Sequence, residues 1–275
     1  MTTSGPSQTV GMLQYAPSMG DIDANIDKID RLLNDSQRSA DIWVLPELAS
    51  SGYNFASKEE AMQLSEPLHK SRFIEYLTQK AAVLDTLFVS GINERDKNRL
   101  YNSALLVGAK GVMGHYRKLH LFNREKEYFT PGDKGLPVFD TPICNIGMLV
   151  CFDWMFPEVW RILALQQVHL IAHPSNLVLP YCQTAMPGYA LTNRIFIATT
   201  NRTGQERDLT FTGQSVLVNP SGEYLLRGGE TEEKALTFSV DLSQAENKKM
   251  TPYNHAFTDR RSDIYHLTEN KKNQK

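Results

Sequence analysis

Three residues of complementary chemistry each follow an apolar run of strand length in this 275-residue chain. Glu47 follows the run in "DIWVLPEL", Lys118 closes "GVMGHYRK", and Cys151 closes "NIGMLVC". A thiol can attack an electrophilic carbon, a carboxylate can remove the thiol proton, and an ammonium group can stabilise the negative charge that develops. The combination predicts nucleophilic catalysis at a carbon atom.

Cys151 is placed at a turn between a strand and a helix that begins near Pro157. A side chain at such a turn points outward, and the amide N–H groups after it point into the same space, as in the nucleophile elbow built around serine. The N–H group of Phe152 is therefore expected to help hold a developing oxyanion. Free cysteines more often pack in the core, which stays the alternative for Cys151 alone and is favoured for Cys144 and Cys182.

Glu47 is expected at the same sheet edge as Cys151, because sites in open α/β sheets form at the carboxyl ends of the strands. A carboxyl group in apolar surroundings has a raised pKa and can accept a thiol proton near neutral pH. The commoner alternative is an acid that caps the next turn. Lys118 beside a thiol would stabilise the thiolate, with a solvated lysine as the alternative. Glu125 lies among other charged residues, and its position alone does not distinguish it from them as a catalytic residue.

Helical and strand-like patterns alternate along the chain and position these residues. The patterns predict helices over 20–35, 71–85, 157–167 and 189–196. They predict strands over 9–17, 41–48, 86–93, 144–152, 168–176, 197–202, 213–222 and 235–243, and a hairpin over 100–118 that turns near Lys110 and Gly111. Repeated alternation indicates a layered α/β fold, which we expect to form one domain over residues 1–275.

The bulk composition disfavours several classes of protein. The net charge of -2 is spread along the chain, which argues against a nucleic-acid partner. No basic stretch and apolar run mark a secretory signal, and no apolar run approaches the roughly 18 residues of a membrane helix. The three cysteines show no paired spacing, so neither a disulfide framework nor a thiolate metal site is expected. We expect a cytoplasmic protein that needs no cofactor.

Three segments carry a resemblance to a known family. "LPELASSGY", "HYRKLHLF" with "REKEYFTPGD", and "CFDWMFPE" resemble, in the same order, the motif regions of the nitrilase superfamily of carbon–nitrogen hydrolases. The similarity extends from about Gly11 to Tyr265. It implies a four-layer α–β–β–α sandwich and a Glu–Lys–Cys triad.

Carried over residue by residue, the resemblance gives Glu47 the place of the general base, Lys118 that of the oxyanion stabiliser and Cys151 that of the nucleophile. Glu125 matches a second glutamate that positions the lysine and the substrate, and Glu127 is its neighbouring alternative. Family members commonly form dimers or larger oligomers. The C-terminal segment, here from about residue 244, is therefore expected to contact a neighbouring subunit, and the last residues, "NKKNQK", are expected to be disordered.

The motifs look most like the prokaryotic branch of small-amide hydrolases and aliphatic nitrilases. Tyr53, Phe152, Trp154 and Tyr181 are expected to wall an acyl pocket for short, uncharged groups, with packing beneath the turn as the alternative for Trp154. No arginine stands out as a clamp for a substrate carboxylate, although Arg202 in "TTNRTG" stays a candidate. The resemblance therefore implies an aliphatic amidase that forms a Cys151 thioester.

Other functions remain open at this stage. Cleavage of small nitriles or dinitriles uses the same residues and is the second possibility. A thiol enzyme of the Cys–His type would depend on His173 or His120. A catalytically inactive scaffold would lack a member of the triad, whereas here all three are present.

Overall fold

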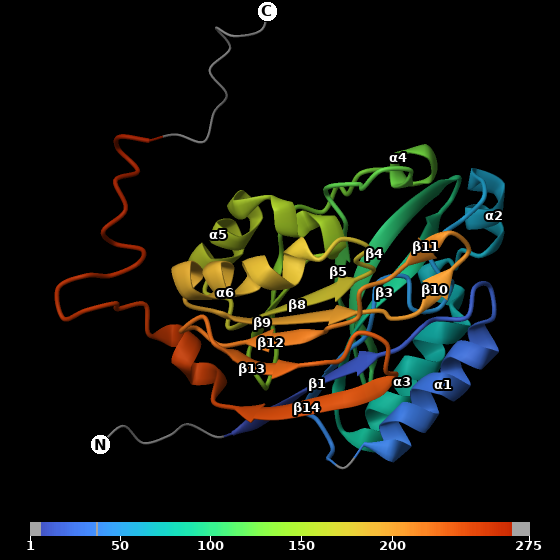
Figure 1. Cartoon of the computed structure of the whole chain (residues 1–275), viewed down its shortest axis with the longest axis horizontal. Coiled ribbons are helices and arrows are strands. Elements are labelled where there is room, and N and C mark those ends of the chain that lie inside the picture. The colour runs from blue at the N-terminus through green and yellow to red at the C-terminus, as the bar shows by residue number, and fades with distance from the viewer. Residues whose placement is uncertain (1–6, 37, 266–275) are drawn as a thin grey trace, which may run out of the picture.

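Two six-stranded β-sheets packed face to face form the centre of the protein (Figure 1). The computed structural model describes residues 7–36 and 38–265, so the C-terminal "NKKNQK" lies outside the described residues. Helices cover the outer face of each sheet (Figure 1). The predicted four-layer α–β–β–α sandwich is confirmed.

The first sheet joins parallel and antiparallel strands in the order β14-β1-β2-β3-β4-β5, and β2 pairs in parallel with both β1 and β3. Its strands are β1 (Gln8–Gln14), β2 (Ile42–Val44), β3 (Leu87–Asp96), β4 (Arg99–Gly108), β5 (Gly111–Arg117) and β14 (Lys234–Val240). The predicted hairpin is confirmed as β4 and β5, joined at Ala109 and Lys110.

The second sheet has the order β13-β12-β9-β8-β7-β6, with β7, β8 and β9 parallel to one another. Its strands are β6 (Val138–Asp140), β7 (Asn145–Met148), β8 (Leu170–Ser175), β9 (Phe196–Asn201), β12 (Val216–Val218) and β13 (Tyr224–Arg227). A small separate ribbon pairs β10 (Gln205–Glu206) with β11 (Leu209–Thr210).

The outer layers consist of helices whose ends follow the chemistry of the sequence. The α-helices are α1 (Ile22–Asp35), α2 (Lys58–Gln63), α3 (Arg72–Leu84), α4 (Glu125–Tyr128), α5 (Pro157–Leu165) and α6 (Tyr181–Asn193), and three 3₁₀ turns are η1 (Leu68–Lys70), η2 (Cys151–Met155) and η3 (Leu242–Glu246). Asp21 caps α1 by accepting a hydrogen bond from the Ala24 N–H, and Ser71 caps α3 in the same way.

Alternation along the strands separates two parts of the core. Ile42 and Val44 of β2 face the second sheet, whereas Trp43 between them packs among the side chains under α1 and α3. A Cβ atom on Gly11 of β1 would lie 2.3 Å from the Trp43 ring, so only glycine permits this close approach. Both faces of the first sheet are therefore buried.

The helix predicted over 189–196 is wrong in its bounds. Helix α6 begins eight residues earlier, at Tyr181, and ends at Asn193, while β9 begins at Phe196. Pro187 and Gly188 lower the local helix propensity, but packing of buried side chains such as Met186 against the sheet outweighs it.

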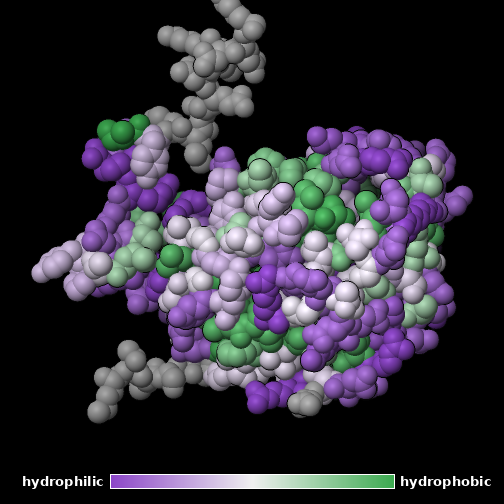
Figure 2. Space-filling view, in the orientation of Figure 1, coloured by the Kyte–Doolittle hydropathy of each residue, from purple (hydrophilic) through white to green (hydrophobic). Residues whose placement is uncertain are grey.

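Hydrophilic residues cover most of the face shown in Figure 2, with hydrophobic residues gathered in separate patches. Among residues 7–36 and 38–265, no helix is both long and apolar enough to cross a membrane. The segment that follows η3 runs along the edge of the molecule in Figure 1; its Phe257 packs against the main core, whereas Tyr253 is 94% exposed. Its contact with a neighbouring subunit stays a prediction.

Candidate active site

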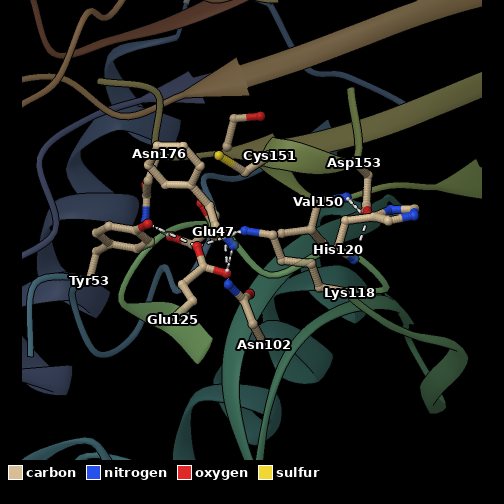
Figure 3. A network of polar contacts seen from close by, with 12 residues as sticks. Glu47, Tyr53, Asn102, Lys118, His120, Glu125, Val150, Cys151, Asp153 and Asn176 are labelled. Atoms are coloured by element: carbon tan, nitrogen blue, oxygen red, sulfur yellow. Dashed lines mark hydrogen bonds and ion pairs between the residues drawn. The ribbon is translucent and has the colours of Figure 1, made fainter. Parts of the chain in front are cut away.

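The structure brings Glu47, Lys118 and Cys151 together where β2, β5 and β7 end (Figure 3). Lys118 Nζ donates to Glu47 Oε1 at 2.7 Å and to Glu125 Oε1, also at 2.7 Å. Glu127 instead pairs with Arg124 at the surface. The second glutamate of the site is therefore Glu125, and one buried ammonium group is shared by two carboxylates.

Cys151 occupies a strained backbone position at the first residue of η2. Its φ angle is +42°, a left-handed conformation that costs free energy for a residue with a side chain. Asp153 holds this turn, because its Oδ2 accepts hydrogen bonds from the Val150 N–H at 2.9 Å and the Tyr116 hydroxyl at 2.7 Å. The sequence reasoning missed Asp153, although an acid in the first turn after a strand is a known capping signal.

Both histidines proposed as alternative bases have other partners. His173 Nε2 lies 2.9 Å from the backbone oxygen of Cys151, and burial lowers the pKa of His173 to about 4. The neutral ring therefore donates its N–H to that carbonyl and braces the turn. His120 Nδ1 lies 2.8 Å from Asp153 Oδ1. These contacts support the turn around Cys151 and leave a carboxylate as the better base.

Asn102 on β4 connects Glu47 and Lys118. Its Nδ2 donates to Glu47 Oε1 at 2.6 Å, and its backbone oxygen accepts from the Lys118 N–H at 2.8 Å. Sequence reasoning missed this residue, since its importance depends on β4 lying beside β5, the strand that ends directly before Lys118. Asn102 therefore fixes the spacing between Glu47 and Lys118.

Burial and charge together set the resting protonation of the site. Burial raises the pKa of the Cys151 thiol well above its usual value, the Glu47 carboxylate raises it further, and Lys118 acts in the opposite direction. Burial opposes the charge on Lys118, but Glu125 and Glu47 outweigh it and raise the lysine pKa. Burial raises the pKa of Glu125 to about 7, against the pull of Lys118. The resting site holds a neutral thiol beside a charged lysine.

Cys151 opens into a small cavity of about 40 Å³. The cavity is lined by Phe122, Cys151, Phe152, Trp154, Asn176, Leu177, Val178 and Leu179. An adjoining cavity of about 220 Å³ shares Phe122, Val178 and Leu179, and both Tyr53 and Glu125 line it. Tyr53, Phe152 and Trp154 thus line these cavities, and their contact with an acyl group stays a prediction.

Comparisons with known proteins identify the family of the chain. The model of the carbon–nitrogen hydrolase family matches residues 9–250. This chain belongs to the carbon–nitrogen hydrolase family. It is a nitrilase-superfamily enzyme that cleaves carbon–nitrogen bonds.

Relatives of this carbon–nitrogen hydrolase carry different activities in their names. A "Nitrilase" of Pyrococcus abyssi is 41% identical over 257 residues, which cover 93% of this chain and 98% of the relative. An "(R)-stereoselective amidase" of a Pseudomonas species is 31% identical, covering 86% and 85%. The crystal structure of a carbon–nitrogen hydrolase from Helicobacter pylori superposes with a TM-score of 0.84 at 27% identity, covering 94% of this chain and 97% of that chain.

Tyr181 does not wall the pocket of this hydrolase, contrary to the expectation. It is the first residue of α6, its exposed fraction is 60%, and neither cavity beside Cys151 includes it. Helix α6 starts earlier than the sequence pattern indicated, and its first turn directs Tyr181 to solvent. The neighbouring Leu177, Val178 and Leu179 wall the cavity instead.

Arg202 is not available to clamp a substrate carboxylate. It is 1% exposed, and its Nη1 donates to Glu206 Oε2 at 2.7 Å. Its guanidinium also lies 4.0 Å from the centroid of the Phe211 ring. Glu206 in turn accepts hydrogen bonds from the Tyr53 and Asn54 N–H groups, so Arg202 supports the loop that carries Tyr53.

No group of three or more His, Cys, Asp or Glu side chains placed to hold a metal ion occurs within residues 7–36 and 38–265.

Proposed function

We propose that this enzyme hydrolyses small aliphatic amides to carboxylic acids and ammonia through a thioester on Cys151. One observation carries the proposal: Lys118 Nζ is held at 2.7 Å by both Glu47 and Glu125, beside a strained cysteine that opens into a cavity. The arrangement supplies a base, a nucleophile and a fixed positive charge within one buried site.

In the first half-reaction Glu47 accepts the proton of the Cys151 thiol as the sulfur attacks the amide carbon. The carbon–sulfur bond forms, and the carbonyl electron pair moves onto oxygen. Lys118 stabilises this oxyanion together with the Phe152 N–H, because an ammonium group has three N–H donors and the two carboxylates occupy two of them. The carbon–nitrogen bond then breaks, and Glu47 returns its proton to the departing ammonia.

In the second half-reaction water replaces the sulfur. Glu47 removes a proton from the water, whose oxygen attacks the thioester carbon. The same two donors stabilise the second oxyanion, and the thiol leaves with the proton that Glu47 holds. Glu125 keeps the lysine in place through both steps, because it accepts a second hydrogen bond from Lys118 Nζ at 2.7 Å (Figure 3).

The size and lining of the cavities support a short, uncharged acyl group. Aromatic side chains of Phe122, Phe152 and Trp154 border the space at the sulfur, which is only about 40 Å³. A space of this size is close to that of one water molecule and accommodates the reacting group, while the adjoining 220 Å³ receives the rest of the substrate.

Hydrolysis of small nitriles is the second candidate, and the relative from Pyrococcus abyssi favours it because it is named a nitrilase at 41% identity. The same residues serve this reaction. The sulfur would add to the nitrile carbon to give a thioimidate, and water would convert that adduct to the acid and ammonia.

The experiment that tests the proposal measures ammonia release from propionamide and propionitrile. Cys151→Ala serves as the blank, and Cys144→Ala is the matched control because Cys144 is a buried free cysteine directly before β7, the strand that Cys151 follows. Release from propionamide that Cys144→Ala retains and Cys151→Ala abolishes supports the amidase. Release from the nitrile alone moves the enzyme to the second candidate, and full activity of Cys151→Ala contradicts both.

A further inference from the structure

Three buried side-chain oxygens in the site of Lys118 and Cys151 have no hydrogen-bond partner among the described residues. They are Glu47 Oε2, Asn102 Oδ1 and Asn176 Oδ1. A buried acceptor without a donor costs free energy, because it has lost its water without gaining a replacement. Such acceptors inside an active site indicate donors that arrive with a ligand.

Asn176 follows β8 and is the one of these three residues that lines the cavity at Cys151. Its Nδ2 donates to the backbone oxygen of Glu47 at 2.9 Å. The backbone oxygen of Glu47 can only accept a hydrogen bond, so the atom of the Asn176 side-chain amide that contacts it is the nitrogen. The oxygen of Asn176 is thereby left as a free acceptor in a side chain that is 2% exposed.

Asn176 also contacts the nucleophile. Its backbone N–H forms a hydrogen bond with the Cys151 sulfur, which lowers the thiol pKa slightly against the effect of burial. Figure 3 shows Asn176, Glu47 and Cys151 around one space. The two unpaired acceptors thus belong to residues that both act on the Cys151 thiol, Asn176 through its N–H and Glu47 through its charge.

We propose that Asn176 Oδ1 is a specificity-determining acceptor that binds one N–H of an unsubstituted carboxamide, with Glu47 Oε2 accepting the other. The inference rests on the proposed function and deepens it. A primary amide offers two N–H donors at the reacting carbon, whereas a nitrile or an ester offers none. The pair of acceptors therefore selects primary amides, because other substrates would leave both oxygens unpaired.

Asn176 has a second effect that the test must separate. Its Nδ2 holds the Glu47 backbone, so removing the side chain could displace the base. Displacement of Glu47 would slow every substrate alike, since all of them need the thiol proton removed. Loss of the Oδ1 acceptor would slow amides and spare compounds that lack N–H groups.

The experiment compares kcat/KM for propionamide and methyl propionate in the wild-type enzyme and in Asn176→Leu. The inhibition constant of propionaldehyde is measured alongside. The Cys151 sulfur can add to the aldehyde carbon, and the resulting adduct has no N–H group. The expected result is a loss of about ten- to a hundredfold for the amide. The ester rate and the aldehyde inhibition constant are expected to change by less than about threefold.

Two further variants make the readout specific. Asn193→Leu is the matched control, because Asn193 is also 2% exposed, donates through Nδ2 to a backbone oxygen and has an unpaired Oδ1, but lies at the end of α6. It is expected to leave the amide-to-ester ratio unchanged. Asn176→Asp keeps an acceptor and is expected to hold that ratio within about threefold of the wild-type value, whatever its absolute rate.

An equal loss for amide, ester and aldehyde in Asn176→Leu would overturn the inference in favour of a purely supporting role, and an unchanged ratio would overturn it as well. If Asn176→Leu fails to fold, the ratio in Asn176→Ala decides in the same way. Wild-type enzyme that turns over the ester and the nitrile but no amide would instead contradict the proposed function. The two failures are therefore distinguishable.

Discussion

Two buried cations stand next to each other at the end of β5, and they have opposite surroundings. Lys118 is shared by Glu47 and Glu125, and all three side chains are almost fully buried. Arg117 contacts Glu94 on β3, and its other carboxylate partners, Asp96 and Asp133, are about half exposed. The lysine cluster faces a cavity, whereas the arginine cluster faces solvent at its edge.

The arginine cluster is saturated with hydrogen bonds. Glu94 receives hydrogen bonds from Arg117 and the Ser103 hydroxyl, and His115 Nε2 lies 2.7 Å from its Oε2. The guanidinium also lies 3.6 Å from the centroid of the Tyr101 ring. Although burial opposes it, this environment lowers the pKa of Glu94 to about 2.

The lysine cluster is left incomplete. Two carboxylates compete for one ammonium group, Glu47 Oε2 has no partner within the described part of the chain, and the pKa of Glu125 rises to about 7. Burial of an acid beside a cation therefore does not by itself determine the role of the acid. Saturated contacts hold structure, whereas unsaturated contacts leave groups free to bind a substrate and to move a proton.

The largest expected effect is a loss of activity when Lys118 is replaced, in contrast to a loss of stability when Arg117 is replaced. Lys118→Met is expected to lower kcat/KM per folded molecule by about 10²–10³-fold or more, because an oxyanion donor is lost. Arg117→Met is expected to lower the free energy of unfolding by about 1.5–3 kcal/mol, because Glu94 loses its charged guanidinium donor and keeps the contacts with Ser103 and His115. Urea denaturation and initial rates on the folded fraction measure both quantities.

The control for this comparison is the activity of the Arg117 variant. Arg117→Met is expected to retain kcat/KM within about tenfold once the unfolded fraction is subtracted, since its side chain does not line the cavity at Cys151. A loss of activity in Arg117→Met as large as that in Lys118→Met would show that the two clusters are not separate in function.

A second prediction uses the opposite pKa shifts of the two glutamates. The lowered pKa of Glu94 contributes stability that is present above the ordinary value of 4.5 and is lost as the pH falls toward 2. The raised pKa of Glu125 works the other way: its contribution is complete below 4.5 and is lost as the pH rises through about 7. Urea denaturation across this pH range should show both slopes.

Isosteric variants assign each slope to its residue. Glu94→Gln should flatten the loss of stability in acid and leave the slope between pH 4.5 and 7 unchanged. Glu125→Gln should do the reverse. If Glu125→Gln kept the slope near neutral pH, another group would be responsible for it.

The sequence predicted the layered fold and the convergence of the three strand-end residues, for a simple physical reason. Continuous apolar runs identify strands that are buried on both faces, and the carboxyl ends of parallel strands meet at one edge. It did not predict Asn102, Asp153 or Asn176, because their importance depends on which strands are neighbours and on which face each polar group turns to.

Tyr181 and Arg202 do not line the pocket, for related reasons. Tyr181 was expected there, but the first turn of α6 faces solvent. Arg202 was considered as a carboxylate clamp because an arginine near a site can serve as one, but Glu206 four residues later neutralises it in the interior. Such pairings depend on the path of the chain after β9, which sequence spacing does not reveal.

The smallest expected effect compares two tyrosines, one in each cluster. The Tyr53 hydroxyl donates to Glu125 Oε1 at 2.8 Å, and this hydrogen bond lowers the Glu125 pKa against the larger effect of burial. Tyr53→Phe should therefore raise the Glu125 pKa above about 7 and move the acidic limb of the kcat/KM profile to higher pH by about half to one unit. Tyr101→Phe keeps the ring beneath Arg117 and should leave the profile in place. An unchanged profile in Tyr53→Phe would mean that Glu125 holds Lys118 equally well in either protonation state. The two clusters would then differ in their unpaired oxygens and not in the pKa values of their acids.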